Sequence, residues 1–105
     1  MISDGVRSVL STMRRNNRRT IIQTAQLEVG DKDIRCMAYD ISLGGIRVKA
    51  DKSLKKGTNV HIYIKDRLRE TAKVIWTADG FMGLSFMDSP ENVRLNMGPL
   101  ATGLS

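Results

Sequence analysis

Two groups of side chains in this sequence have the chemistry to bind a flat, anionic ligand together. The first is a run of arginines, RRNNRR, at positions 14–19, and the second is a polar segment, DISLGG, at positions 40–45. Arginine forks suit phosphate oxygens and the O6/N7 edge of guanine. An ionised aspartate only accepts hydrogen bonds, so Asp40 could receive the adjacent N1–H and N2–H₂ donors of a guanine.

The spacing of the arginines allows two pairings. Arg15 and Arg19 lie four positions apart, and so do Arg14 and Arg18. A spacing of four brings both side chains to one face of a helix or of an extended segment, so either pair can converge on one ligand. A basic arm is also typical of a solvated surface or of a nucleic-acid contact.

The DISLGG segment predicts a tight turn that carries two polar side chains. Asp40 and Ser42 are two positions apart, so both point the same way in an extended chain. Gly44 and Gly45 permit a sharp turn and let a ligand approach the backbone. The same residue types are usual in purely structural β-turns, and the pattern alone leaves that alternative open.

Size and composition predict one ordinary globular domain. The chain has 105 residues, of which 41% are hydrophobic and 27% are charged, so it needs no disulfide or metal to fold. The net charge is +6, and residues 1–19 carry +4 of it, which implies an anionic partner. The single cysteine, the lack of an apolar run of about 18 residues, and the lack of a signal-peptide pattern predict a cytoplasmic protein without a membrane span.

The periodicity of apolar residues predicts six strands with a short helix at each end. Residues 4–13 show a helical apolar face, which needs a partner or a second copy to cover it. From position 20 the period changes to two, and the expected strands are 20–29, 34–40, 46–50, 60–64, 68–76 and 81–86, with hairpin turns at 30–33 and 77–80. Ser89-Pro90-Glu91 predicts a helix start and Gly98-Pro99 its end.

These elements predict a mainly β fold, namely a small closed antiparallel barrel of six strands. The chain then divides into an N-terminal amphipathic helix (1–13), an arginine-rich ligand-binding arm (14–19), and the barrel with its C-terminal helix (20–105). Cys36 is expected in the core and His61 on the outer face of its strand. No cluster of metal ligands, positioned nucleophile or phosphate-binding glycine loop is present in the sequence, so we expect neither a metal site nor an enzyme.

The two motifs together resemble the PilZ domain family, whose members bind cyclic di-GMP. The family pattern is RxxxR before the first strand and D/N-x-S-x-x-G after the second. MRRNNRRT (13–20) and DISLGGIRV (40–48) follow that order, and VIWTADGFMGLSF (74–86) is similar to the family's last two strands. The resemblance spans residues 14–97 and implies a six-stranded antiparallel barrel with a C-terminal helix.

The resemblance also implies roles for individual residues. In the preferred register, Arg15 and Arg19 grip phosphates and a guanine Hoogsteen edge, with Arg14–Arg18 as the competing register. Asp40 and Ser42 then receive the guanine from the barrel side, and Gly45 keeps the floor of the site open.

Two further positions bear on the ligand. Arg14 directly precedes the preferred motif, and an arginine there accompanies a stacked pair of ligand molecules in the family, so one or two cyclic di-GMP molecules are expected. Trp76 lies where some relatives place an aromatic residue near the ligand. Its phase with Val74 instead favours a place in the barrel core.

The sequence therefore predicts a non-enzymatic bacterial receptor for cyclic di-GMP, without a cofactor. Ligand phosphates neutralise the arm, which orders over the barrel and re-aims the N-terminal helix toward a downstream protein, with the chain a monomer or weak dimer. One alternative is a small barrel that binds RNA or single-stranded DNA, although only five aromatic residues are available for base stacking. The other is a degenerate PilZ scaffold that binds no nucleotide.

Overall fold

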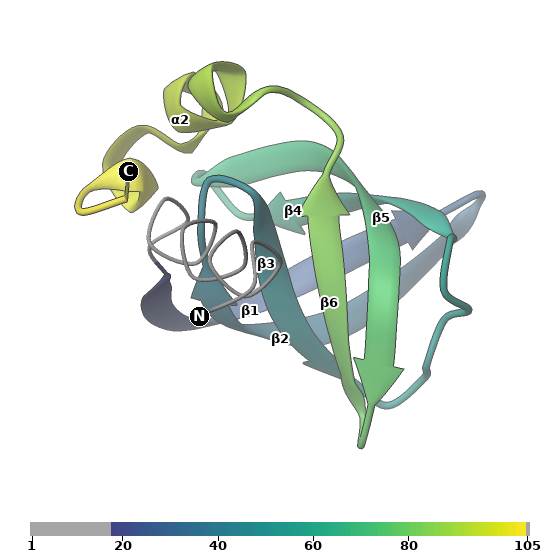
Figure 1. Cartoon of the computed structure of the whole chain (residues 1–105). Coiled ribbons are helices and arrows are strands. Elements are labelled where there is room, and N and C mark those ends of the chain that lie inside the picture. The colour runs from purple at the N-terminus through teal and green to yellow at the C-terminus, as the bar shows by residue number, and fades with distance from the viewer. Residues whose placement is uncertain (1–17, 105) are drawn as a thin grey trace, which may run out of the picture.

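The chain folds into a closed antiparallel β-barrel, with one end covered by the C-terminal segment (Figure 1). The computed structural model describes residues 18–104, so the expected helix over 4–13 and residues 14–17 of the arm lie outside the described part. The strands are β1 (Arg19–Val29), β2 (Lys32–Ile41), β3 (Gly45–Ala50), β4 (Asn59–Ile64), β5 (Leu68–Ala78) and β6 (Phe81–Phe86). They are followed by the helix α2 (Pro90–Met97) and the 3₁₀ helix η1 (Gly98–Ala101).

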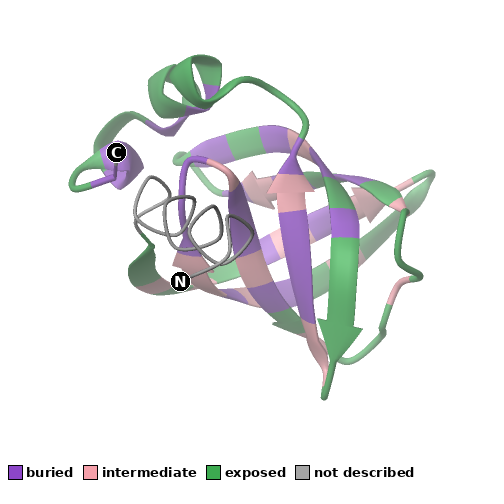
Figure 2. Ribbon diagram, in the orientation of Figure 1, coloured by how far each residue is buried: buried purple, intermediate pink, exposed green. Residues whose placement is uncertain are grey.

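The strands follow one another around the barrel in the order β1-β2-β3-β6-β5-β4, and β4 pairs with β1 to close it. Every pairing is antiparallel, which confirms the six-stranded barrel expected from the sequence. Alternation of side chains fills the interior, as in β4, where Val60, Ile62 and Ile64 are buried. Figure 2 shows buried and exposed positions alternating along the strands.

Two hairpin turns are shorter than the sequence suggested. Val29 pairs with Lys32, so the turn expected over 30–33 contains only residues 30 and 31. Ala78 pairs with Phe81, and the turn expected over 77–80 is the pair Asp79-Gly80. These two residues have φ angles of 53° and 85°, a left-handed pair that matches the twist of the flanking strands.

Irregularities in the strand pairing change which side chains face outward. The register shifts between Thr20 and Gln23 in β1, and again between Val74 and Trp76 in β5. Ile22, within the first shift, has a φ of 41° and is 55% exposed. Trp76 is 39% exposed, so its expected place in the core was wrong, because the shift after Val74 breaks the alternation on which that prediction rested.

The predicted C-terminal helix is confirmed. The Ser89 hydroxyl caps it by accepting from the backbone N–H of Asn92 at 3.3 Å, and Gly98 ends it with a φ of 56°. The sequence did not predict the 3₁₀ turn that follows. Both elements lie over one end of the barrel (Figure 1), where they bury the apolar residues Val93, Met97, Leu100 and Ala101, and Leu104 after them is buried too.

Two side chains outside the binding motifs lie as expected. Cys36 is in the core, where burial raises the pKa of its thiol to about 12. His61 is exposed, and its Nδ1 lies 3.1 Å from the Thr71 hydroxyl on the neighbouring strand. Within residues 18–104 no three His, Cys, Asp or Glu side chains gather where they could hold a metal ion. None of the helices in that range is long and apolar enough to cross a membrane.

Candidate functional site

The turn between β2 and β3 is built around the hydroxyl of Ser42. This oxygen accepts from the backbone N–H groups of Gly44 and Gly45, both at 3.2 Å, and the Ser42 N–H donates to the Gly45 carbonyl at 2.8 Å. Ser42 is only 1% exposed, so its polar groups serve mainly to hold the turn. A Cβ on Gly45 would stand 2.2 Å from the Leu84 carbonyl oxygen, so glycine allows β3 to lie this close to β6.

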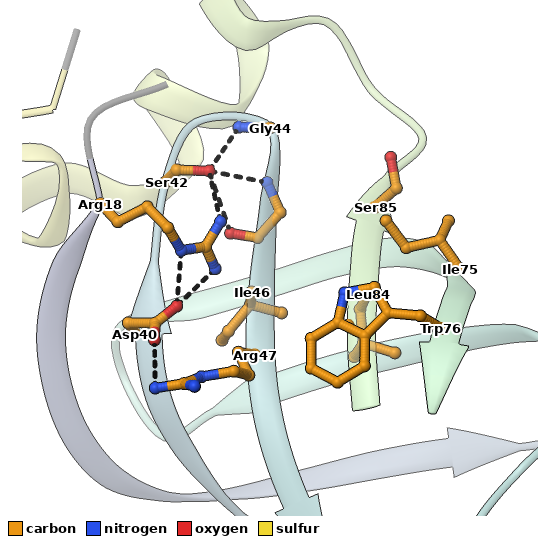
Figure 3. Close-up of a pocket in the computed structure, with 12 residues that line it drawn as sticks. Arg18, Asp40, Ser42, Gly44, Ile46, Arg47, Ile75, Trp76, Leu84 and Ser85 are labelled. Atoms are coloured by element: carbon orange, nitrogen blue, oxygen red, sulfur yellow. Dashed lines mark hydrogen bonds and ion pairs between the residues drawn. The ribbon is translucent and has the colours of Figure 1, made fainter. Parts of the chain in front are cut away.

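Asp40 lies just before this turn and is contacted by two arginines, Arg18 directly before β1 and Arg47 within β3 (Figure 3). Arg18 places its Nε 2.6 Å and its Nη2 2.5 Å from Oδ1 of Asp40. Arg47 of β3 places its Nη2 2.8 Å from the other oxygen, Oδ2. The Asp40 side chain is 14% exposed, whereas those of Arg18 and Arg47 are 47% and 42% exposed. The carboxylate is therefore more deeply buried than either of the two cations that contact it.

These groups line one side of an open pocket of about 660 Å³. Its lining comes from the residue before β1 and from β2, β3, β5, β6 and the turn: Arg18, Asp40, Ser42, Gly44, Gly45, Ile46, Arg47, Ile75, Trp76, Gly83, Leu84 and Ser85. Strand pairing sets Asp40 beside Arg47, Arg47 beside Gly83, and Gly83 beside Trp76. A single row across four strands thus presents a carboxylate, a guanidinium and an indole.

Trp76 forms the apolar side of the pocket, across from Asp40 and Arg18 (Figure 3). Its indole covers Gly83, because a Cβ added to that glycine would lie 2.0 Å from the indole Nε1. The neighbouring Ile75 is 45% exposed and extends this apolar surface. The pocket can therefore offer a flat surface to an aromatic ring, and hydrogen-bonding groups of both kinds to its polar edges.

The adjacent arginines of the motif point to different places. Arg18 lies in the pocket, whereas Arg19 donates through Nη1 to the carbonyls of Pro99, Leu100 and Thr102 at 3.2–3.5 Å. Arg19 therefore contacts the C-terminal segment, although the preferred sequence register made it a ligand clamp. Arg14 and Arg15, the other two candidates of the arm, lie outside the described residues.

Among the pocket residues that sequence reasoning missed, Arg47 and Gly83 matter most for the chemistry of the pocket. Arg47 had a detectable signal, because it lies two positions after Gly45 in an alternating strand and pairs with Asp40 across a short turn. Gly83 had a weaker one, because a glycine inside a strand often marks a close approach. Its role depends on the position of the Trp76 indole, which the sequence did not reveal.

The comparison with known families is decisive for the identity of the fold. The model of the PilZ domain matches residues 13–97, which is most of the chain. The chain belongs to the PilZ domain family. The comparison with curated proteins returned no match.

Solved structures of PilZ domains share this barrel. The PilZ domain of CeSA from a cellulose-synthesizing bacterium has a TM-score of 0.62 and 21% identity, over 79% of this chain and 97% of that one. The Bacillus subtilis inhibitor of motility (MotI/DgrA) has a TM-score of 0.65 and 20% identity, over 85% of this chain and 50% of its own. YcgR of Escherichia coli, solved in complex with c-di-GMP, has a TM-score of 0.64 and 19% identity, over 85% of this chain and 45% of that one. This PilZ chain therefore spans about half the length of the last two proteins.

Proposed function

We propose that this chain is a non-enzymatic receptor for cyclic di-GMP, which binds in the pocket between Arg18 and Trp76. The observation that carries the proposal is the environment of Asp40, a recessed carboxylate with a guanidinium on each oxygen beside an apolar, aromatic surface. Membership of the PilZ family supports it, and so does the likeness of the barrel to YcgR, whose structure contains c-di-GMP.

The chemistry of the ligand matches the groups in the pocket. A guanine offers two adjacent donors, which a carboxylate such as Asp40 accepts, and acceptors on its opposite edge, which suit an arginine fork. The phosphates of the ligand are anions for the basic segment that precedes the barrel. Trp76 offers a surface on which a purine can stack.

We further propose that the motif arginines are Arg14 and Arg18. The position of Arg18 on Asp40 supports this register, and so does the contact of Arg19 with the C-terminal segment. Met13 then takes the place directly before the motif, where the family resemblance linked an arginine to a stacked pair of ligands. The proposed stoichiometry is therefore one cyclic di-GMP per chain.

Binding would move Arg18 from Asp40 toward the ligand, and the segment before Arg18 would follow it. We propose that a downstream protein reads this change, and that the receptor works in the bacterial cytoplasm as a monomer or weak dimer. Part of the contact energy is then used to order the chain, which links ligand binding to the signal.

Calorimetric titration with cyclic di-GMP tests the proposal. Wild type should bind at micromolar or tighter concentrations with a stoichiometry of one. Asp40→Ala should lower the affinity roughly 10- to 100-fold, because it removes charge-assisted hydrogen bonds. Asp51→Ala is the matched control, because it removes the same charge at an exposed residue that lines no part of this pocket.

Three outcomes would redirect the assignment. No response to cyclic di-GMP, together with salt-sensitive binding of a polynucleotide, would favour the nucleic-acid alternative. No binding of either would favour the degenerate scaffold. A stoichiometry of two that falls to one in Arg14→Ala would restore the Arg15–Arg19 register, whereas simple loss of affinity supports Arg14–Arg18.

A further inference from the structure

Arg47 is held more firmly than a surface arginine usually is. Besides its 2.8 Å contact with Oδ2 of Asp40, its guanidinium carbon lies 5.2 Å from the ring centroid of Phe81 and 6.0 Å from that of Tyr39. The two rings pack edge to face at 5.1 Å. The Nε of Arg47 is buried and has no hydrogen-bond partner within residues 18–104, and the guanidinium lies over these aromatic rings.

The two oxygens of Asp40 differ in how much room they leave for a ligand. An ionised carboxylate has about four acceptor sites, two on each oxygen. Within residues 18–104, Oδ1 receives two groups of Arg18, its Nε and Nη2, whereas Oδ2 receives only Nη2 of Arg47. A ligand with two adjacent donors needs both oxygens. Arg18 must therefore leave Oδ1, but Arg47 can stay on Oδ2 while the ligand binds.

We infer that Arg47 is a positioning residue that fixes the Asp40 carboxylate and thereby sets the selectivity of the pocket for guanine over adenine; the inference rests on the proposed function. Arg18 is the exchangeable partner of Asp40, and Arg47 is the permanent one. The Phe81 and Tyr39 rings keep Arg47 in place when Arg18 departs.

The chemical basis of this selectivity is the edge that each purine presents. Guanine shows N1–H and N2–H₂, which both donate, whereas adenine shows an N1 acceptor beside its N6–H₂ donor. A fixed carboxylate accepts both guanine hydrogens and repels the adenine N1. If Asp40 loses its support from Arg47, the carboxylate can rotate to accept from N6–H₂ alone, and adenine is rejected less strongly.

The test compares cyclic di-GMP with cyclic di-AMP by calorimetry in wild type, Arg47→Met and Arg47→Lys. In Arg47→Met the affinity for cyclic di-GMP should fall roughly tenfold, and the preference over cyclic di-AMP should narrow by a similar factor. Arg47→Lys keeps the charge but not the fork, so its affinity for cyclic di-GMP and its preference over cyclic di-AMP should lie between those of the wild type and Arg47→Met. Arg69→Met is the matched control, because it removes an arginine that also lies over an aromatic ring and near a carboxylate. Thermal melts show that each variant is folded.

A double-mutant cycle separates positioning from direct contact. If Arg47 acts through Asp40, Arg47→Met should have little further effect on cyclic di-GMP affinity in the Asp40→Asn background. A full additional loss in that background would show a direct ligand contact and overturn the inference. Tighter binding of cyclic di-GMP by Arg47→Met would also overturn it, because it would mark Arg47 as a competitor of the ligand. An unchanged preference of Arg47→Met for cyclic di-GMP over cyclic di-AMP would overturn it as well. Failure of the wild type to bind cyclic di-GMP would refute the proposed function itself, and is thus a distinct result.

Discussion

The packing of the Trp76 indole over Gly83 predicts a specific effect of the substitution Gly83→Ala. The added Cβ would lie 2.0 Å from the indole Nε1, whereas non-bonded heavy atoms approach to about 3.5–4.0 Å, so the ring must move by about 1.5–2 Å. Trp76 is already 39% exposed and can swing toward solvent. We therefore expect the free energy of unfolding to fall by about 1 kcal/mol, near the low end for overpacked substitutions. For a domain of this size that lowers the Tm by about 4–8 °C.

Fluorescence measures the displacement directly, because Trp76 is the only tryptophan in the chain. Gly83→Ala should shift the emission to longer wavelength and increase quenching by acrylamide, and it should weaken cyclic di-GMP binding roughly fivefold or more through lost stacking. Thr77→Ala is the control, because it removes an exposed side chain next to Trp76 in sequence without adding an atom beneath the ring. Unchanged emission and quenching in folded Gly83→Ala would refute the placement of the indole.

Three further substitutions test other parts of the structure. Gly45→Ala should lower the thermal midpoint more than Gly83→Ala does, because its Cβ would meet the backbone oxygen of Leu84 at 2.2 Å and no side chain can move aside; an equal or smaller loss would contradict this packing. Cys36→Ala should retain more of its stability than wild type does between pH 9 and 12, measured by urea denaturation. The raised thiol pKa of about 12 means that the unfolded chain loses its proton first, so the folded state of the wild type loses stability as pH rises above 9; parallel pH profiles would argue against a buried thiol. Ser89→Ala should lower the free energy of unfolding by about 1 kcal/mol, because it removes the cap of the C-terminal helix, and urea denaturation measures this loss. An unchanged free energy of unfolding would mean that the hydrogen bond from Asn92 to Ser89 contributes little.

The sequence predicted the architecture because most strands alternate cleanly. Residues 46–50 and 60–64 keep one apolar face without interruption, and the structure contains both as strands β3 and β4. The cap at Ser89 was equally local, because its residue types identify a helix start without any tertiary information. Features decided by residues close in sequence could therefore be predicted from the sequence alone.

The errors arose where pairing between strands overrides local alternation. The bulge after Val74 moves Trp76 from the expected core to the pocket, and an insertion of this kind is set by the partner strand β6. The register of the arginines was ambiguous for a similar reason. Both pairs have the same spacing, and the proposed Arg14–Arg18 register rests on the direction of Arg18 toward Asp40 and of Arg19 toward the C-terminal carbonyls.

Calorimetric titration of cyclic di-GMP into two neighbouring variants, Arg18→Ala and Arg19→Ala, tests the central claim most directly. The two changes remove the same charge at adjacent positions, so general electrostatic attraction is matched. If the pocket beside Asp40 is the receptor site, Arg18→Ala should lower the affinity roughly 10- to 100-fold, whereas Arg19→Ala should bind nearly as the wild type does once melts show it is folded. Equal small losses in both variants, or loss in Arg19→Ala alone, would contradict the account.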